Sequence, residues 1–272
     1  MNKIYIPTTK PEDWKPLLAD PKHWRSGYSA MALAYCWQNA NGFPASVKRV
    51  FNKSKIDLLY NMDILFAMPE YSVALPGGAR TSQNDLFLLA KNGDDLITIT
   101  VEGKVNEPFG PLVSDWFQNP SPSKKKRLAF ICDKLGLEQS KIFNIRYQLL
   151  HRTASSIIEA ERFNAPNAMM LVHSFSQTNE WFDDFLAFAS LFKIDAEFNR
   201  VYNAGEIGGI NLYLGWVKGE EKYLQMEPAD EKLLGTVTAK KCECCGHHEI
   251  GIETDVGEYA PLKPGMKVEI KD

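Results

Sequence analysis

The sequence predicts an α/β fold in which a mixed central sheet is flanked by helices and followed by a small β-rich C-terminal extension. Residues 84–105 contain two apolar runs joined by a turn signal, which is typical of a β-hairpin. Residues 145–163 have the apolar period of an amphipathic helix, and residues 168–175 form an apolar run typical of a buried strand. We therefore expect an α/β domain at residues 1–225, with a helical N-terminal region, and the extension at residues 226–272.

The segments before the hairpin are mostly helical in pattern. Residues 25–39 are rich in alanine and predict a helix, which the Asn-Gly-Phe-Pro segment at 41–44 ends. Residues 45–51 predict a second, shorter helix. Residues 71–76 predict a short strand, because the Pro-Gly-Gly segment at 76–78 is a strong turn signal.

The hairpin register follows from its turn. Asn-Gly between two apolar runs is among the strongest short hairpin signals. If residues 92–95 form the loop, Lys91 pairs with Leu96, and counting outward places Asp85 opposite Glu102. Directly opposed residues have Cβ atoms about 5 Å apart. The pattern therefore predicts two carboxylates side by side at the open end of the hairpin.

A third ionisable group joins them. A two-residue loop would place Asp85 opposite Thr100, which is still one same-face neighbour from Glu102. Glu102 and Lys104 lie two residues apart, so they project from one face of a strand. Two carboxylates this close repel each other unless a cation or a proton lies between them, and hard oxygen ligands suit Mg²⁺ or Mn²⁺.

Asp85 followed by Glu102-Gly103-Lys104 on a hairpin resembles the core of the PD-(D/E)xK nuclease superfamily, which has the restriction-endonuclease-like fold. The resemblance implies that Asp85 and Glu102 bind Mg²⁺ or Mn²⁺ together with the backbone carbonyl of Gly103. It also implies that Lys104 orients or activates the attacking water. The residue before Asp85 is Asn84, whereas the superfamily motif has proline at this position.

The long helix agrees with the same resemblance. Strand, hairpin, long helix and buried strand is similar to the superfamily's αβββαβ order, and the helix is expected to end at residues 164–166. The second helix of the superfamily commonly carries a polar residue directed toward the metal. Gln148 and Arg152 match that position, so Gln148 is a candidate catalytic residue. The alternative is that the polar stripe of the helix is its solvated face.

A basic cluster offers a candidate contact with nucleic acid. Residues 123–136 predict a helix with Ser123 as its N-cap. Four cations crowd its first turn, where each opposes the helix dipole by about 0.3–1 kcal/mol. These residues are Lys124, Lys125, Lys126 and Arg127. We expect them, with Arg152, to contact phosphates; the alternative is a solvated turn.

The C-terminal region contains a candidate zinc site. Cys242 and Cys245 have the C-x2-C spacing of a zinc knuckle, and His247 and His248 follow. A second paired knuckle is missing, so a loop of reduced thiols is the alternative. Upstream, residues 181–192 predict a helix that covers the sheet and residues 210–219 a further strand. The segment at 262–270 predicts a turn and a last strand.

Composition restricts the class of protein. The chain has 44% hydrophobic and 24% charged residues, as is ordinary for a soluble globular protein. Its net charge of −3 excludes a broadly basic nucleic-acid binder but permits a local positive path to a metal. We expect no signal peptide and no membrane span. The odd number of five cysteines indicates reduced thiols and a cytoplasmic location.

Together these patterns predict a Mg²⁺- or Mn²⁺-dependent nuclease, most simply an endonuclease, that hydrolyses DNA phosphodiester bonds. A second hypothesis is a non-catalytic partner-binding protein on the same fold, with the Cys/His tail as a Zn²⁺-dependent interaction module. A third is a phosphoryl hydrolase that acts on small nucleotides. The sequence leaves the oligomeric state open, with a homodimer as one candidate.

Overall fold

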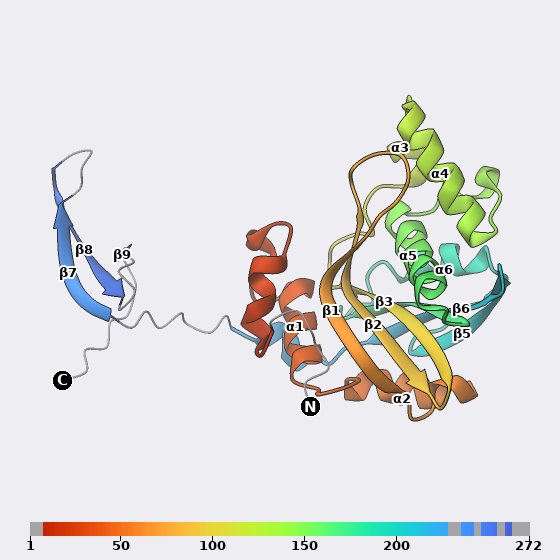
Figure 1. Ribbon diagram of the computed structural model, residues 1–272, viewed down its shortest axis with the longest axis horizontal. Coiled ribbons are helices and arrows are strands. Elements are labelled where there is room, and N and C mark those ends of the chain that lie inside the picture. The colour runs from red at the N-terminus through yellow and green to blue at the C-terminus, as the bar shows by residue number, and fades with distance from the viewer. Residues whose placement is uncertain (1–7, 228–234, 242–245, 255–258, 263–272) are drawn as a thin grey trace. The chain divides into compact units, whose positions relative to one another are not determined.

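The computed structural model describes residues 8–227, 235–241, 246–254 and 259–262. The chain divides into two compact units, Met1–Pro228 and Ala229–Asp272, which are considered separately here. The boundary expected from the sequence, after residue 225, falls just before this division. The first unit is an α/β structure with a mixed sheet between two layers of helices (Figure 1), as the sequence predicts.

The sheet of the first unit has six strands in the order β1-β2-β3-β4-β6-β5. Strands β1 to β3 form an antiparallel meander, β4 and β6 run parallel to β3, and β5 pairs antiparallel with β6 at the edge. Their bounds are β1 Asp63–Val73, β2 Ser82–Asn92, β3 Asp95–Lys104, β4 Asn167–Ser174, β5 Arg200–Ile207 and β6 Ile210–Lys218.

Helices cover both faces of this sheet (Figure 1). Helices α4, α5 and α6 belong to one layer, and α1 and α2 belong to the other. The α-helices are α1 Ser29–Gln38, α2 Ala45–Ser54, α3 Val113–Trp116, α4 Pro122–Leu135, α5 Tyr147–Phe163 and α6 Phe182–Ser190. Short 3₁₀ helices lie at η1 Pro11–Leu17, η2 Pro21–His23, η3 Asp57–Leu59, η4 Gln139–Lys141 and η5 Glu221–Gln225.

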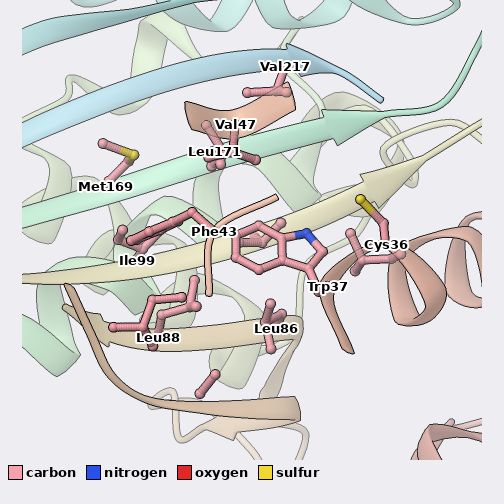
Figure 2. Close-up of a cluster of buried hydrophobic side chains, with 14 of the residues drawn as sticks. Cys36, Trp37, Phe43, Val47, Leu86, Leu88, Ile99, Met169, Leu171 and Val217 are labelled. Carbon is pink, nitrogen blue, oxygen red and sulfur yellow. The ribbon is translucent and has the colours of Figure 1, made fainter. Parts of the chain in front are cut away.

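Strand β4 separates two hydrophobic cores. All eight of its residues are buried, as expected for a strand covered on both faces. Because side chains alternate along a strand, Met170 faces the core under α4 to α6, whereas Met169 and Leu171 face the core under α1 and α2. Figure 2 shows the second core, where Trp37 of α1 lies over the strand residues. Burial of each such side chain stabilises the fold by about 1.5–3 kcal/mol.

The predicted hairpin and its register are confirmed. Lys91 pairs with Leu96, and Asn92 pairs with Asp95 around a Gly93-Asp94 loop. Gly93 has a φ of 58°, which glycine adopts without strain. The hairpin therefore keeps the register that places Asp85 beside Glu102.

The first strand differs from the prediction. Strand β1 begins at Asp63 and ends at Val73, so the short strand expected at residues 71–76 is wrong at both ends. Pro69 lies inside β1, and a proline within an apolar run argues against a strand. It is accommodated because β1 is at the edge of the sheet, where a missing N–H costs no ladder bond on the open side.

The basic helix also begins at a different cap. Ser121, rather than Ser123, is the N-cap of α4, and its Oγ accepts a hydrogen bond from the Lys124 N–H at 3.3 Å. Pro122 then occupies the first helical position, where its fixed φ and missing N–H are favourable. The prediction of a helix here is confirmed, but its first turn begins earlier.

Helix α5 is buried on more than its apolar side. The prediction of a helix at this place is confirmed, and its apolar residues pack in the core with α4 and α6. Its polar residues Arg152, Ser155 and Glu159 are also buried. The solvated-face alternative is therefore wrong for these three. Tertiary packing explains this, because α5 contacts β2, β3 and β4 as well as α4.

The remaining predicted elements are present. The two N-terminal helices, the helix over residues 181–192 and the strand at 210–219 correspond to α1, α2, α6 and β6. Strand β5 was not expected. It is a half-exposed strand at the edge of the sheet, and its apolar and polar residues alternate only weakly. The sequence pattern that identifies strands is therefore weak here.

The second unit is β-rich, as predicted. Its described residues form an antiparallel sheet of β7 Gly235–Lys241, β8 His248–Thr254 and β9 Tyr259–Pro261. The strand expected near the C-terminus lies outside the described residues beyond Leu262. Within the part of the chain that the structure describes, no helix has the length and apolarity needed to cross a bilayer.

Candidate active site

Three ionisable side chains lie on one face at the open end of the β2–β3 hairpin. The ladder pairs Leu86 with Val101, so the next residues outward are Asp85 and Glu102. Glu102 and Lys104 face α5, because Glu102 bonds directly to Arg152 of that helix and to Lys104. The structure therefore brings together Asp85, Glu102 and Lys104, with Arg152 above them.

Glu102 is the centre of a buried ion-pair network. Its Oε1 lies 2.7 Å from Lys104 Nζ and its Oε2 lies 2.6 Å from Arg152 Nε. Glu102 is only 2% exposed. Burial by itself raises the pKa of Glu102, but the charges and hydrogen bonds of Arg152 and Lys104 hold this pKa below its ordinary value. Glu102 is therefore an ionised carboxylate with a cation at each oxygen.

Asp85 lies at the open end of the hairpin and is bonded to the backbone of β3. Its Oδ2 accepts a hydrogen bond from the Gly103 N–H at 2.8 Å, just beyond the last backbone pair of the ladder. Burial and, after it, the nearby Glu102 charge raise the pKa of Asp85 to about 7, although the charges of Arg152 and Lys104 and the Gly103 hydrogen bond act to lower it. With a pKa of about 7, Asp85 changes its protonation state near neutral pH.

Glu70 is a further acidic neighbour of Asp85. It lies on β1 between the residues that pair with Leu86 and Asn84, which places it beside Asp85. Its Oε2 accepts a hydrogen bond from Gln83 Nε2 at 2.8 Å. Burial and the Asp85 charge raise the pKa of Glu70 to about 9. Glu70 reaches Asp85 through the pairing of β1 with β2, which no local sequence pattern specifies.

Ser82 and His151 extend the network away from the carboxylates. Ser82 Oγ lies 2.7 Å from His151 Nδ1 and accepts from Arg152 Nη1 at 3.4 Å. Burial, with the charge of Arg152, lowers the pKa of His151 well below its ordinary value, so the ring is neutral. The Ser82 hydroxyl also lies 3.4 Å from the His151 backbone carbonyl, to which it can donate.

Gln148 and Arg152, the two helix candidates, occupy different environments. Arg152 is buried, and its hydrogen bonds to Glu102 and Ser82 place it within the carboxylate cluster. Gln148 lies one turn earlier on α5, and its buried Oε1 has no hydrogen-bond partner among the described residues. The catalytic role suggested for Gln148 stays a prediction, whereas Arg152 has a visible structural role at Glu102.

The chemistry of the donors fits a hard divalent cation. Asp85, Glu102 and Glu70 supply carboxylate oxygens, and the two cations Lys104 and Arg152 leave one negative charge uncompensated when all three are ionised. Within the described residues, no group of three or more His, Cys, Asp or Glu is arranged to hold a metal ion. The ligand set of Asp85, Glu102 and the Gly103 carbonyl stays a prediction, and a cation bound there would compete with Lys104 for Glu102.

Of the four cations near the start of α4, two are bonded to backbone carbonyls and two are exposed. Arg127 is buried and donates to the backbone carbonyls of the β1–β2 loop. Lys124 is half-buried, and its Nζ donates to the Trp116 carbonyl at 2.6 Å. Lys125 and Lys126 are exposed. Of the cations expected to contact phosphates, these last two have their charged groups free to do so.

The zinc prediction concerns residues that the structure describes only in part. Cys242 and Cys245 lie outside the described residues. His247 and His248 are described and exposed, and His248 pairs with Lys241 at the start of β8. Zinc binding by this tail stays a prediction.

Comparison with known proteins gives one match. A family model described as a domain of unknown function (DUF6946) matches residues 7–221. No curated protein and no solved structure matches the chain. The matched region contains the six-stranded sheet and all the residues of the carboxylate cluster.

Proposed function

The chain belongs to the DUF6946 family, whose function is unknown, and we propose that it is a metal-dependent nuclease of the restriction-endonuclease-like fold. The substrate would be a DNA phosphodiester, and Asp85, Glu102 and Lys104 would form the active site. The observation that carries this proposal is the convergence of these three side chains on one sheet face at a hairpin end.

The topology supports the same proposal. An antiparallel meander of β1 to β3 is followed by α5 and by β4, which is parallel to β3. This is the αβββαβ order that the resemblance to PD-(D/E)xK nucleases implies. Helix α5 supplies Arg152 to the carboxylate cluster, which is the position at which that resemblance expects a polar residue.

Each residue has a defined task in the proposed reaction. Asp85 and Glu102, with the Gly103 carbonyl, would hold Mg²⁺ or Mn²⁺. The metal would polarise a phosphoryl oxygen and lower the pKa of its bound water. Lys104 would place a positive charge beside the phosphorus, where negative charge develops during attack. Arg152 fixes the orientation of the Glu102 carboxylate through its bond to Oε2.

One observation favours a second candidate, a non-catalytic protein on the same fold. Both oxygens of Glu102 are already bonded to cations, and Asp85 already accepts from Gly103. The purely structural task of joining α5 to the sheet is sufficient to explain a network satisfied in this way. Under this candidate, the zinc tail would be the interaction module.

DNA cleavage by the purified chain distinguishes the two candidates. Supercoiled plasmid and linear duplex are incubated with Mg²⁺, with Mn²⁺ or with EDTA, and single-stranded DNA and RNA are included as further substrates. We expect strand breaks with either metal and none with EDTA. Absence of cleavage of every substrate under all metal conditions would support the non-catalytic candidate.

Metal binding should depend on pH because of Asp85 and Glu70. Their raised pKa values, about 7 and about 9, mean that the folded protein holds protons that the unfolded chain has released. Their contribution to stability is therefore present at acidic pH and is lost as the pH rises through these values. A metal that replaces the protons should restore stability, and it should do so more at pH 8 than at pH 5.5.

Thermal unfolding with and without metal measures this effect. At a metal concentration 100 times Kd, binding stabilises by about 2.7 kcal/mol, which corresponds to roughly 5–10 °C at pH 8. Asp85→Asn, which keeps an acceptor for Gly103, should abolish the shift. Asp95→Asn is the matched control, because Asp95 is exposed at the other end of the hairpin. Equal shifts at both pH values, or an unchanged shift in Asp85→Asn, would contradict the assigned metal site.

A further inference from the structure

Two segments next to the carboxylate cluster carry positive charge and no negative charge. Residues 71–84 and residues 116–132 contain five cations and no aspartate or glutamate. The whole chain has 34 acidic residues and a net charge of −3, so two such segments create a local positive field on an otherwise acidic protein. The five cations are Arg80, Lys124, Lys125, Lys126 and Arg127.

Arg127 joins the two segments. Its guanidinium donates to the carbonyls of the β1–β2 loop at 3.0 Å for Pro76 and 2.6 Å for Arg80, and also to Leu75 and Gly78. Gly77 has a φ of +85°, and a Cβ there would lie 2.2 Å from the Ser123 carbonyl oxygen. The loop is therefore held against the first turn of α4, with Arg127 as the positioning residue.

Three cations of this assembly remain exposed. Arg80 lies in the loop, and Lys125 and Lys126 lie near the N-terminus of α4. None of the three has an ion-pair partner among the described residues. We call Arg80, Lys125 and Lys126 the basic shoulder. Lysines at a helix N-terminus oppose the helix dipole, so an external anion would relieve their repulsion.

The basic shoulder is connected to the carboxylate cluster through β2. Asp85 follows Arg80 by five residues, which at a strand rise of about 3.4 Å gives a separation of at most roughly 17 Å. One strand of B-DNA rises about 3.4 Å per nucleotide, so this separation spans roughly five nucleotides. A DNA backbone held at Arg80 is therefore within reach of the carboxylates.

We propose that the basic shoulder binds the phosphate backbone of DNA on one side of the bond to be cut, at most about five nucleotides from it. This inference rests on the proposed nuclease function and adds the surface that holds its substrate. Exposed lysines and an arginine neutralise phosphates without reading bases, so the contact is independent of sequence. Arg127 takes part by holding the loop and not by touching the phosphate.

Salt dependence of DNA binding tests the shoulder directly. Affinity of a 30-base-pair duplex is measured in EDTA at several salt concentrations for wild type and for R80Q/K125Q/K126Q. Three lost phosphate contacts should lower the slope of log Kd against log salt by about 2–3 and weaken binding at low salt at least about 10-fold. The matched control is K48Q/K53Q/K55Q, which removes three exposed cations at α2 on the other face of the sheet and should change neither value.

The role of Arg127 is tested by Arg127→Lys. Lysine keeps the charge but cannot donate to four carbonyls, so the loop should detach from α4. We expect a lower Tm and a DNA affinity reduced as in the triple variant, although the net charge is unchanged. Wild-type affinity in a destabilised Arg127→Lys variant would show that the loop does not need this anchor.

The DNA-binding and DNA-cleavage results test the basic shoulder and the nuclease proposal independently. A flattened salt slope in the triple variant, with no cleavage by wild type under any metal condition, would support the shoulder and reject the catalytic proposal. Equal salt slopes in wild type and triple variant would overturn the shoulder even if the protein cleaves DNA. Failure of wild type to bind DNA at low salt would overturn the shoulder as well.

Discussion

Glu102→Gln is expected to lower metal-dependent DNA cleavage by at least about 1,000-fold. The substitution replaces a carboxylate that would hold the metal with a neutral amide of the same shape. It also removes the negative charge between Lys104 and Arg152, which lie 2.7 and 2.6 Å from the two carboxylate oxygens. The measurement is the initial rate of plasmid cleavage with Mg²⁺ and with Mn²⁺.

Glu102→Gln should also reduce stability, because the buried cations Lys104 and Arg152 both lose their ionised partner. Breaking a buried ion pair on one side costs about 3–5 kcal/mol. The cleavage assay is therefore run well below the Tm of the variant, with folding checked by circular dichroism. Glu159→Gln is the matched control, since Glu159 is a fully buried glutamate of α5 that is ion-paired with Arg162 and lies outside the cluster. Unchanged cleavage by folded Glu102→Gln would reject this site.

Lys104→Met is expected to lower the cleavage rate by about 100- to 1,000-fold while leaving metal binding intact or tighter. Lys104 neutralises Glu102 in the structure, so its removal makes the cluster more negative and more attractive to a cation. Methionine keeps the length of the side chain, and Lys104 Nζ lies 5.0 Å from the centre of the Phe109 ring, a surface that suits a thioether. The metal-induced rise in Tm should be retained.

Lys218→Met is the matched control for Lys104→Met. Lys104 pairs in register with Ser174 of β4, which in turn pairs with Lys218 of β6. The two lysines therefore lie in one row at the same end of parallel strands, but Lys218 bonds to the Gln177 carbonyl and not to a carboxylate. Lys218→Met should keep the cleavage rate. Loss of the metal-induced Tm rise in Lys104→Met would show that Lys104 supports the metal site instead of the chemical step.

The core of the candidate site could be predicted because its geometry is local. The turn at residues 92–95 sets the register of β2 and β3, and the period of two in a strand puts Glu102 and Lys104 on one face. Both rules act over fewer than twenty residues of continuous chain. Asp85 beside Glu102 follows from counting alone.

Residues from distant segments were harder to assign. Glu70 enters the cluster only because β1 pairs with β2 across an intervening loop, and a proline inside β1 conceals the strand. Arg152 was expected either near the metal site or in contact with nucleic acid, and only the packing of α5 on the sheet decides that it bonds to Glu102. The neutral state of His151 likewise depends on burial that no sequence pattern shows.

The sequence by itself determined the kind and order of most elements, the register of the hairpin and the carboxylates at its end. These features follow from periodicity and turn chemistry, which are properties of neighbouring residues. Only the tertiary structure decided which charges are paired, which are buried and which are free. Arg127 and Lys125 are two residues apart in one basic run, yet one is enclosed by backbone carbonyls and the other faces solvent. The difference arises because the β1–β2 loop, about fifty residues away in sequence, packs against one side of α4 and leaves the other side open.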